Sequence, residues 1–145
     1  MRLYIIHPDA ARQPVAATVA REIHRSLPAD QSHLACDSQA APADDDFILA
    51  VFSLRPGSFA PLLPAYRELR DKKVAFVALL AGPADSSRAR KTAWAIKKQF
   101  CGNQVLAGYL CPAEDDLAWG LKDDELGKIL ALAHKLCREH VNPGP

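Results

Sequence analysis

The chain has 145 residues, of which 49% are hydrophobic and 24% charged, values typical of one globular domain rather than of a disordered segment. Its 18 basic and 17 acidic residues leave a formal charge of +1, so no overall electric field favours nucleic acid or a membrane surface as a partner. No stretch approaches the roughly 20 apolar residues of a membrane-spanning helix, and the apolar stretch at the N-terminus is too short for a signal peptide. We therefore expect a cytoplasmic protein that binds neither nucleic acid nor membrane.

The four cysteines are far apart in the sequence, without a C-x-x-C pair or a histidine at metal-ligand spacing: Cys36, Cys101, Cys111 and Cys137. This spacing predicts buried reduced thiols rather than a metal site, in keeping with a reducing compartment. The sequence leaves open whether Cys111 takes part in redox chemistry.

The first third of the chain alternates strand, helix and strand. Residues 3–6 are expected to form a strand, followed by a loop over residues 7–14 in which Asp9 bonds the backbone of the turn. Pro14 suits the first position of a helix, where its missing N–H is not needed. Apolar residues then recur about every four positions, which predicts a helix that covers a sheet and ends at residues 27–28: Val15, Val19, Ile23 and Leu27.

Two nearly continuous apolar runs are the clearest strand signals. Residues 47–53 and 74–80 are too short for core helices and are bounded by turn residues, which is typical of strands buried on both faces. Residues 33–36 resemble a short edge strand, and prolines at positions 61 and 64 leave only about two helical turns at residues 65–70.

The last third of the chain repeats the alternation. A helix capped by Ser86 or Ser87 is expected to carry an apolar stripe: Ala89, Ala93, Ile96 and Phe100. A strand over residues 104–111 and a spacer over residues 112–122 follow. The final helix begins among acidic residues at 123–125, ends among basic ones and has its own stripe: Leu126, Ile129, Leu130, Ala133, Leu136 and Cys137.

This alternation predicts a single α/β domain over residues 1–141, with a frayed tail at residues 142–145. Parallel strands joined by helical crossovers form a three-layer, doubly wound sandwich. Five strands and this chain length favour the strand order 2-1-3-4-5 over the six-stranded dinucleotide-binding fold.

Two blocks of sequence resemble the flavodoxin family, especially its short members. Residues 69–86 read as a leucine, lysines, a buried strand and a small-residue loop ending in Ala-Asp-Ser, and residues 103–111 read as a fifth strand with a glycine and a terminal cysteine. The resemblance is strongest from residue 47 onward. It implies a flavodoxin-like fold, non-covalent flavin mononucleotide (FMN) at the C-terminal ends of the strands, and electron transfer with a redox partner protein.

The positions that would contact FMN depart from the family pattern. Family members bind the phosphate in a Ser/Thr-x-Thr-Gly-x-Thr loop after the first strand. Here the matching residues 11–16 contain a proline and no glycine, Asp9 would repel a dianion, and Arg12 would partly compensate. The loops after the central and fourth strands lack the family's aromatic residues. By resemblance, the cofactor-binding positions are His7, Asp9, Arg12, Gln13, Ser53, Leu54, Arg55, Gly57, Ala81, Gly82 and Asp85.

This degenerate site leaves two functions open: an electron carrier with an atypical flavin site, or a flavin-free accessory or regulatory module that binds a protein target. The chain has neither a dinucleotide nor a P-loop motif. A serine triad is not expected, because Ser53 lacks the flanking glycines of a nucleophile elbow. We predict no catalytic residues and no metal.

Trp94 is the most suggestive surface position. Arg90, Lys91, Lys97 and Lys98 lie three or four residues away, so helical geometry would place them around the indole. The indole would either pack at the edge of the Ala93 and Ile96 stripe or, with Arg90 and Lys98, contact a protein partner or weakly a nucleic acid.

Overall fold

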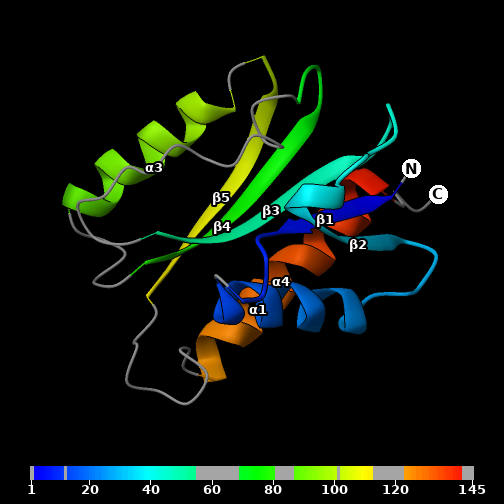
Figure 1. Cartoon of the computed structure of the whole chain (residues 1–145), viewed down its shortest axis with the longest axis horizontal. Helices are drawn as coiled ribbons and strands as arrows, with labels where there is room; N and C mark the ends of the chain where they lie inside the picture. The colour runs from blue at the N-terminus through cyan, green and yellow to red at the C-terminus, as the bar shows by residue number, and fades with distance from the viewer. Residues whose placement is uncertain are drawn as a thin grey trace.

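The computed structural model describes residues 2–11, 13–54, 69–80, 87–100, 102–112 and 123–141. Its described strands form one five-stranded sheet in the order β2-β1-β3-β4-β5, with every neighbouring pair parallel (Figure 1). The strands are β1 (Leu3–His7), β2 (Ser32–Cys36), β3 (Phe47–Leu54), β4 (Lys73–Leu80) and β5 (Gln104–Pro112). The predicted strand order 2-1-3-4-5 is therefore confirmed.

Helices lie on both sides of this sheet. Figure 1 shows α1 (Pro14–Ser26) and α4 (Asp123–Leu136) together on one face, and α3 (Ser87–Gln99) on the other. Two short turns complete the described elements: a 3-10 turn η1 (Asp37–Gln39) after β2 and a π-helical turn η2 (Cys137–Val141) after α4. The result is the predicted three-layer, doubly wound sandwich.

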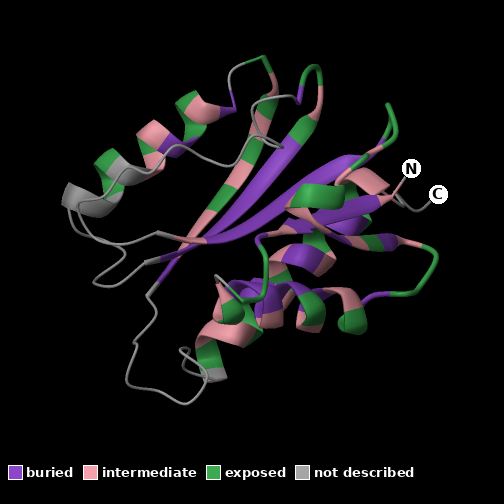
Figure 2. Ribbon diagram, viewed as in Figure 1, coloured by how far each residue is buried: buried purple, intermediate pink, exposed green. Residues whose placement is uncertain are grey.

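Alternate residues of the central strands enter two separate cores. On β3, Leu49 and Val51 pack with α1 and α4, whereas Ile48, Ala50 and Phe52 pack on the side of Ile96 and Phe100 at α3. Figure 2 shows β1, β3 and β4 almost wholly buried and β5 with alternating exposed and half-buried positions. A central parallel strand covered on both faces is apolar at every position, which is why the two continuous apolar runs predicted β3 and β4 correctly.

Some predicted boundaries differ from the structure. His7 belongs to β1, where it pairs with Cys36, rather than to the following loop. Leu54 extends β3, and Pro112 extends β5. Of the helical turns predicted at residues 65–70, residues 65–68 lie outside the described residues, and Leu69 and Arg70 are not helical. The spacer at residues 113–122, the cap at Ser86 and the tail at residues 142–145 also lie outside the described residues.

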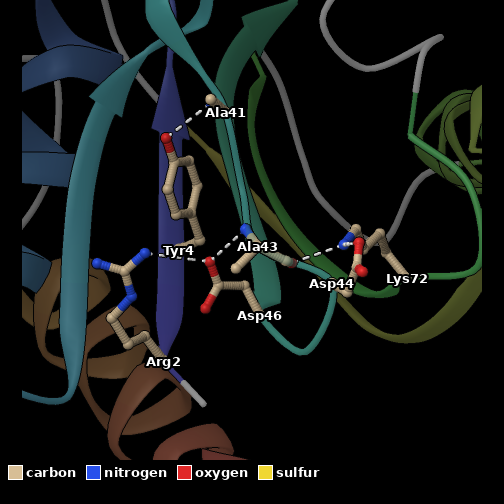
Figure 3. Close-up of polar contacts among 7 residues, drawn as sticks. All are labelled: Arg2, Tyr4, Ala41, Ala43, Asp44, Asp46 and Lys72. Carbon is tan, nitrogen blue, oxygen red and sulfur yellow. Dashed lines mark hydrogen bonds and ion pairs between the residues drawn. The ribbon is translucent and has the colours of Figure 1, made fainter.

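The connection from β2 to β3 contains only the short turn η1, and polar contacts hold the rest of it against the sheet (Figure 3). The Tyr4 hydroxyl on β1 accepts a hydrogen bond of 2.9 Å from the Ala41 N–H. The carboxylate of Asp46, a residue only 4% exposed, accepts one of 2.8 Å from the Ala43 N–H and one of 3.3 Å from Arg2 Nη2. These bonds satisfy buried polar groups in a connection that makes few backbone ladder contacts.

Lys72, just before β4, adds a contact at the other end of the same connection. Its Nζ donates a hydrogen bond of 2.6 Å to the carbonyl oxygen of Ala43 and lies 4.0 Å from the Asp44 carboxylate (Figure 3). Strands β1 and β4 thus both anchor the segment that leads into β3.

Candidate functional site

The C-terminal ends of β1 and β3 lie side by side, and they mark the place where the winding of the sheet reverses. Parallel pairing sets Ile6 of β1 opposite Ala50 of β3. In an open α/β sheet, the crevice at such a reversal is where ligands bind. The turn from β1 to α1 and the end of β3 therefore form the candidate site.

The β1–α1 turn is closed by its own hydrogen bonds. The Asp9 carboxylate accepts a bond of 2.9 Å from the Ala11 N–H, and the Asp9 carbonyl oxygen accepts one of 2.9 Å from the Gln13 N–H. His7 Nδ1 donates a bond of 2.7 Å to the Pro8 carbonyl oxygen, so this nitrogen carries the proton. Asp9 has the turn-forming role expected from the sequence.

Two of the predicted site residues are in direct contact across the strand ends. The Ser53 N–H on β3 donates a hydrogen bond of 2.8 Å to the side-chain oxygen of Gln13. Gln13 is the residue just before α1, and its amide therefore joins the β1–α1 turn to the end of β3 rather than capping its own helix. Ser53 itself is half-buried.

The start of α1 offers backbone donors to an anion. Pro14 occupies the first helical turn, and no side chain caps the helix within the described residues. The first N–H groups of any helix have no acceptor inside the helix, and they form its positive end. Val15 and Ala16 stand at these positions. The donors of this turn fit an anion, whereas the Asp9 carboxylate and the missing glycine oppose a close-fitting phosphate.

Of the remaining predicted cofactor positions, the structure places only Leu54. Leu54 ends β3 opposite Leu80 of β4, which puts its backbone at the same edge of the sheet. Six others lie outside the described residues: Arg12, Arg55, Gly57, Ala81, Gly82 and Asp85.

A second polar cluster, which the sequence analysis missed, joins β5 to α4. The Tyr109 hydroxyl donates a hydrogen bond of 2.5 Å to Glu125 Oε2, and Lys128 Nζ lies 3.6 Å from the other oxygen of Glu125. Burial and then the nearby Glu125 carboxylate raise the pKa of the Cys111 thiol to about 12, and the same two causes raise the pKa of Tyr109. One feature of the sequence could have indicated this cluster. Tyr109 and Cys111 are two residues apart, which puts both side chains on one face of a strand.

The three residues predicted to bind a partner lie on α3. Trp94 is 61% exposed, and Lys98 Nζ lies 3.6 Å from the centre of the indole ring. Arg90 is exposed one turn before Trp94. Ile96 and Phe100, not Trp94, attach the helix to the sheet.

The described residues contain no group of three or more histidine, cysteine, aspartate or glutamate side chains arranged to hold a metal ion. Of the cysteines that the structure describes, Cys111 and Cys137 are buried as predicted, whereas Cys36 at the sheet edge is half-exposed. None of these three forms a disulfide. None of the helices in this part of the chain is long and apolar enough to cross a bilayer.

The sheet order and the three layers define a flavodoxin-like α/β fold. Three flavodoxins of known structure are similar over nearly their whole length. That of Streptococcus pneumoniae TIGR4 has a TM-score of 0.59 at 10% sequence identity, with 96% of this chain and 99% of that chain covered. Flavodoxin 1 of Bacillus cereus has a TM-score of 0.56 at 13% identity, with 95% and 98% covered. The Megasphaera elsdenii flavodoxin has a TM-score of 0.53 at 15% identity, with 92% and 98% covered.

No protein-family model matches the chain, and no curated protein is significantly similar to it in sequence. At 10–15% identity the similar structures establish the fold. The function has to be argued from the site.

Proposed function

We propose that the chain is a flavodoxin-like redox protein that binds FMN non-covalently at the C-terminal ends of β1 and β3, through an altered phosphate-binding turn. The observation that carries this proposal is the Gln13–Ser53 hydrogen bond of 2.8 Å, which holds the β1–α1 turn beside the end of β3 at the reversal point of the sheet. Bound flavin would supply one- or two-electron transfer, and the protein would supply its orientation and electrostatics.

The similar structures are consistent with this redox role. They include an oxidised flavodoxin from Bacillus cereus and a two-electron reduced flavodoxin from Megasphaera elsdenii. In this chain the N-terminal turn of α1 would hold the phosphate, with Arg12 as a forked cation.

One observation favours the second candidate, a flavin-free accessory or regulatory module. The N–H groups of Ala11 and Ser53 are already bound, by the side chains of Asp9 and Gln13 respectively. These two donors are thus occupied without a ligand, and the sheet would then serve as a scaffold for binding a protein target.

The visible absorption spectrum of the purified protein, before and after incubation with excess FMN and desalting, separates the two functions. A retained flavin spectrum supports FMN binding. A colourless protein that unfolds cooperatively and does not quench FMN fluorescence contradicts it and supports the flavin-free module.

Two substitutions then test the phosphate end of the site. Arg12→Ala is expected to weaken FMN binding. Asp9→Asn keeps an oxygen for the Ala11 N–H but removes the negative charge, so it should tighten binding about five- to tenfold. Asp30→Asn, at an exposed position after α1, is the matched control and should leave the affinity unchanged. Equal affinity for FMN in all four proteins would show that the phosphate does not bind at this turn.

A further inference from the structure

Helix α3 is the most charge-biased element of the chain. It contains five of the 18 basic residues and none of the 17 acidic ones: Arg88, Arg90, Lys91, Lys97 and Lys98. The rest of the chain therefore has 13 basic and 17 acidic residues, a formal charge of −4. A near-neutral protein thus has a local excess of five positive charges on one helix.

Trp94 lies at the centre of this charge. At 3.6 residues per turn, Arg90, Lys91, Lys97 and Lys98 all lie within about 60° of Trp94 around the helix, whereas Ile96 is about 200° away. All four basic side chains are exposed, and none of them forms an ion pair with a carboxylate among the described residues. Trp94 and Leu106 are the exposed large hydrophobic residues in that part of the chain.

The exposure of Trp94 leaves the indole available to a partner. Trp94 is 61% exposed, whereas Ile96 and Phe100 of the same segment are buried. The contact of the indole with Lys98 Nζ, 3.6 Å from the ring centre, is a cation–π interaction that keeps one ring face beside a positive charge. Solvent, rather than the protein core, surrounds most of the indole.

We propose that the basic face of α3, formed by Arg90, Lys91, Trp94, Lys97 and Lys98, docks an acidic amphipathic segment of a protein partner. Tryptophan and arginine are the side chains most often found to anchor protein interfaces. Carboxylates of the partner would pair with the four cations, and an apolar side chain would pack on the indole. From Arg90 to Lys98 the face is about 12 Å long, which matches about two turns of a partner helix.

The observations favour an acidic protein segment over a nucleic acid. Lys98 Nζ lies over one face of the indole, so a base could stack on only the other face and could not enclose the ring. The charge of −4 on the remaining residues would also repel a long polyanion but not a short acidic segment. The proposal requires no bound flavin.

Fluorescence anisotropy with a labelled peptide tests the proposal. The probe is a helical peptide of about 13 residues, the length of α3 itself. It consists of glutamate with leucine at every third or fourth position. The wild-type protein is expected to bind it with an affinity that falls as salt rises. Trp94→Ala should weaken binding about 30-fold, as expected for an interface anchor. Lys97→Glu combined with Lys98→Glu should abolish binding.

Lys135→Glu on α4 is the control, because it makes the same type of substitution as each half of the double variant, at an exposed position of another helix. This variant should bind the peptide with nearly the wild-type affinity. Thermal unfolding followed by circular dichroism should be unchanged in Trp94→Ala, since the ring is largely outside the core.

Three outcomes would overturn the proposal. The first is no binding of the peptide by the wild-type protein at millimolar concentration, and the second is binding by Trp94→Ala as tight as that of the wild type. Tighter binding of a single-stranded oligothymidylate than of the peptide would instead assign the face to nucleic acid. Because every arm uses protein without flavin, a failure here leaves the proposed FMN function unaffected.

Discussion

The ring of Phe76 on β4 fills the space beside Gly108 on β5. A Cβ placed on Gly108 would lie 2.3 Å from Phe76 Cζ and 2.7 Å from Cε1, distances that require a shift of one group. The two residues are paired in the sheet, and Phe76 is only 1% exposed. The absence of a side chain on β5 thus allows a large aromatic ring of β4 to cover the edge of the sheet.

Gly108→Ala should therefore destabilise the protein. The added methyl group must displace a buried ring, an overpacking cost of about 1–3 kcal/mol. Urea unfolding measures the change in the free energy of unfolding. In a Phe76→Leu background the same substitution should cost less, and an equal cost in both backgrounds would contradict the contact.

Gly127→Ala makes the same chemical change on α4, where it should have the opposite effect. Among the described residues, no atom outside the adjoining helix backbone lies within 4 Å of a Cβ at this position, which is in the interior of the helix and exposed. Alanine is favoured over glycine in a helix by about 0.5–1 kcal/mol. The melting temperature should therefore rise. A fall would mean that a side chain at position 127 disturbs the packing of α4.

Asn103→Ala should loosen the junction between α3 and β4. The Asn103 side chain accepts a bond of 3.0 Å from the Lys72 N–H and donates bonds of 2.9 Å to the Leu69 carbonyl and 3.2 Å to the Phe100 carbonyl. The Lys72 N–H loses its acceptor, whereas the Leu69 carbonyl still accepts from Arg70 Nη1 and the Phe100 carbonyl from the Asn103 N–H. The unpartnered Lys72 N–H should cost about 1–3 kcal/mol. Amide hydrogen exchange at Lys72 should accelerate.

Asn103→Asp distinguishes the roles of the two side-chain atoms of this residue. The aspartate can still accept from Lys72 but cannot donate to the two carbonyl groups. Protection of the Lys72 amide should be retained in this variant while its overall stability falls. Unchanged stability in both variants would contradict the role assigned to Asn103.

The stability of the protein should decline at alkaline pH partly through Cys111. Its pKa is raised from 9.0 to about 12, so the folded form holds the proton after the unfolded form has lost it. The contribution of the protonated Cys111 thiol to the free energy of unfolding is complete below pH 9. It is lost as the pH rises from about 9 towards about 12. Tyr109, whose pKa is also raised, acts in the same direction.

Glu125→Gln tests this coupling, because it removes the negative charge beside the thiol. The pKa of Cys111 should fall, and iodoacetamide should alkylate Cys111 faster at a given mildly alkaline pH, as followed by peptide mass spectrometry. Cys36, which is half-exposed, provides an internal reference whose rate should not change. An unchanged rate at Cys111 would show that burial alone controls its reactivity.

Gln13→Ala should weaken the contact between the β1–α1 turn and β3. Losing the 2.8 Å bond from the Ser53 N–H should cost about 1 kcal/mol and accelerate hydrogen exchange at that amide. Gln104→Ala, at the opposite edge of the sheet, is the control and should change neither quantity. If the Ser53 amide exchanges at the wild-type rate in Gln13→Ala, the bond does not hold the two strand ends together.

The fold could be predicted because its signals are local. The continuous apolar runs at β3 and β4 reflect burial on both faces, and Pro14 with its four-residue apolar period marks α1. Contacts between distant residues left no such signal. His7 continues β1 only because Cys36 pairs with it, and nothing in the local sequence around His7 shows this pairing.

The candidate site was only partly predictable for the same reason. The family resemblance placed both Gln13 and Ser53 among the cofactor-binding positions, but it gave no sign of their hydrogen bond, which joins residues 40 positions apart. The exposure of Trp94 was also undecided, because its neighbours Ala93 and Ala95 are small enough to suit either a buried or an exposed ring. In the structure, Ile96 and Phe100 are the buried residues of this segment that pack on the sheet, and Trp94 is exposed.

The charge on α3 makes the molecule an electric dipole in spite of its formal charge of +1. Figure 1 shows α3 at one side of the molecule, across the sheet from α1 and α4. A negatively charged surface that approaches will therefore rotate the protein until α3 faces it, before any contact forms. The average charge would predict weak retention on a cation-exchange resin, whereas this orientation predicts that the protein binds the resin through one helix and elutes late.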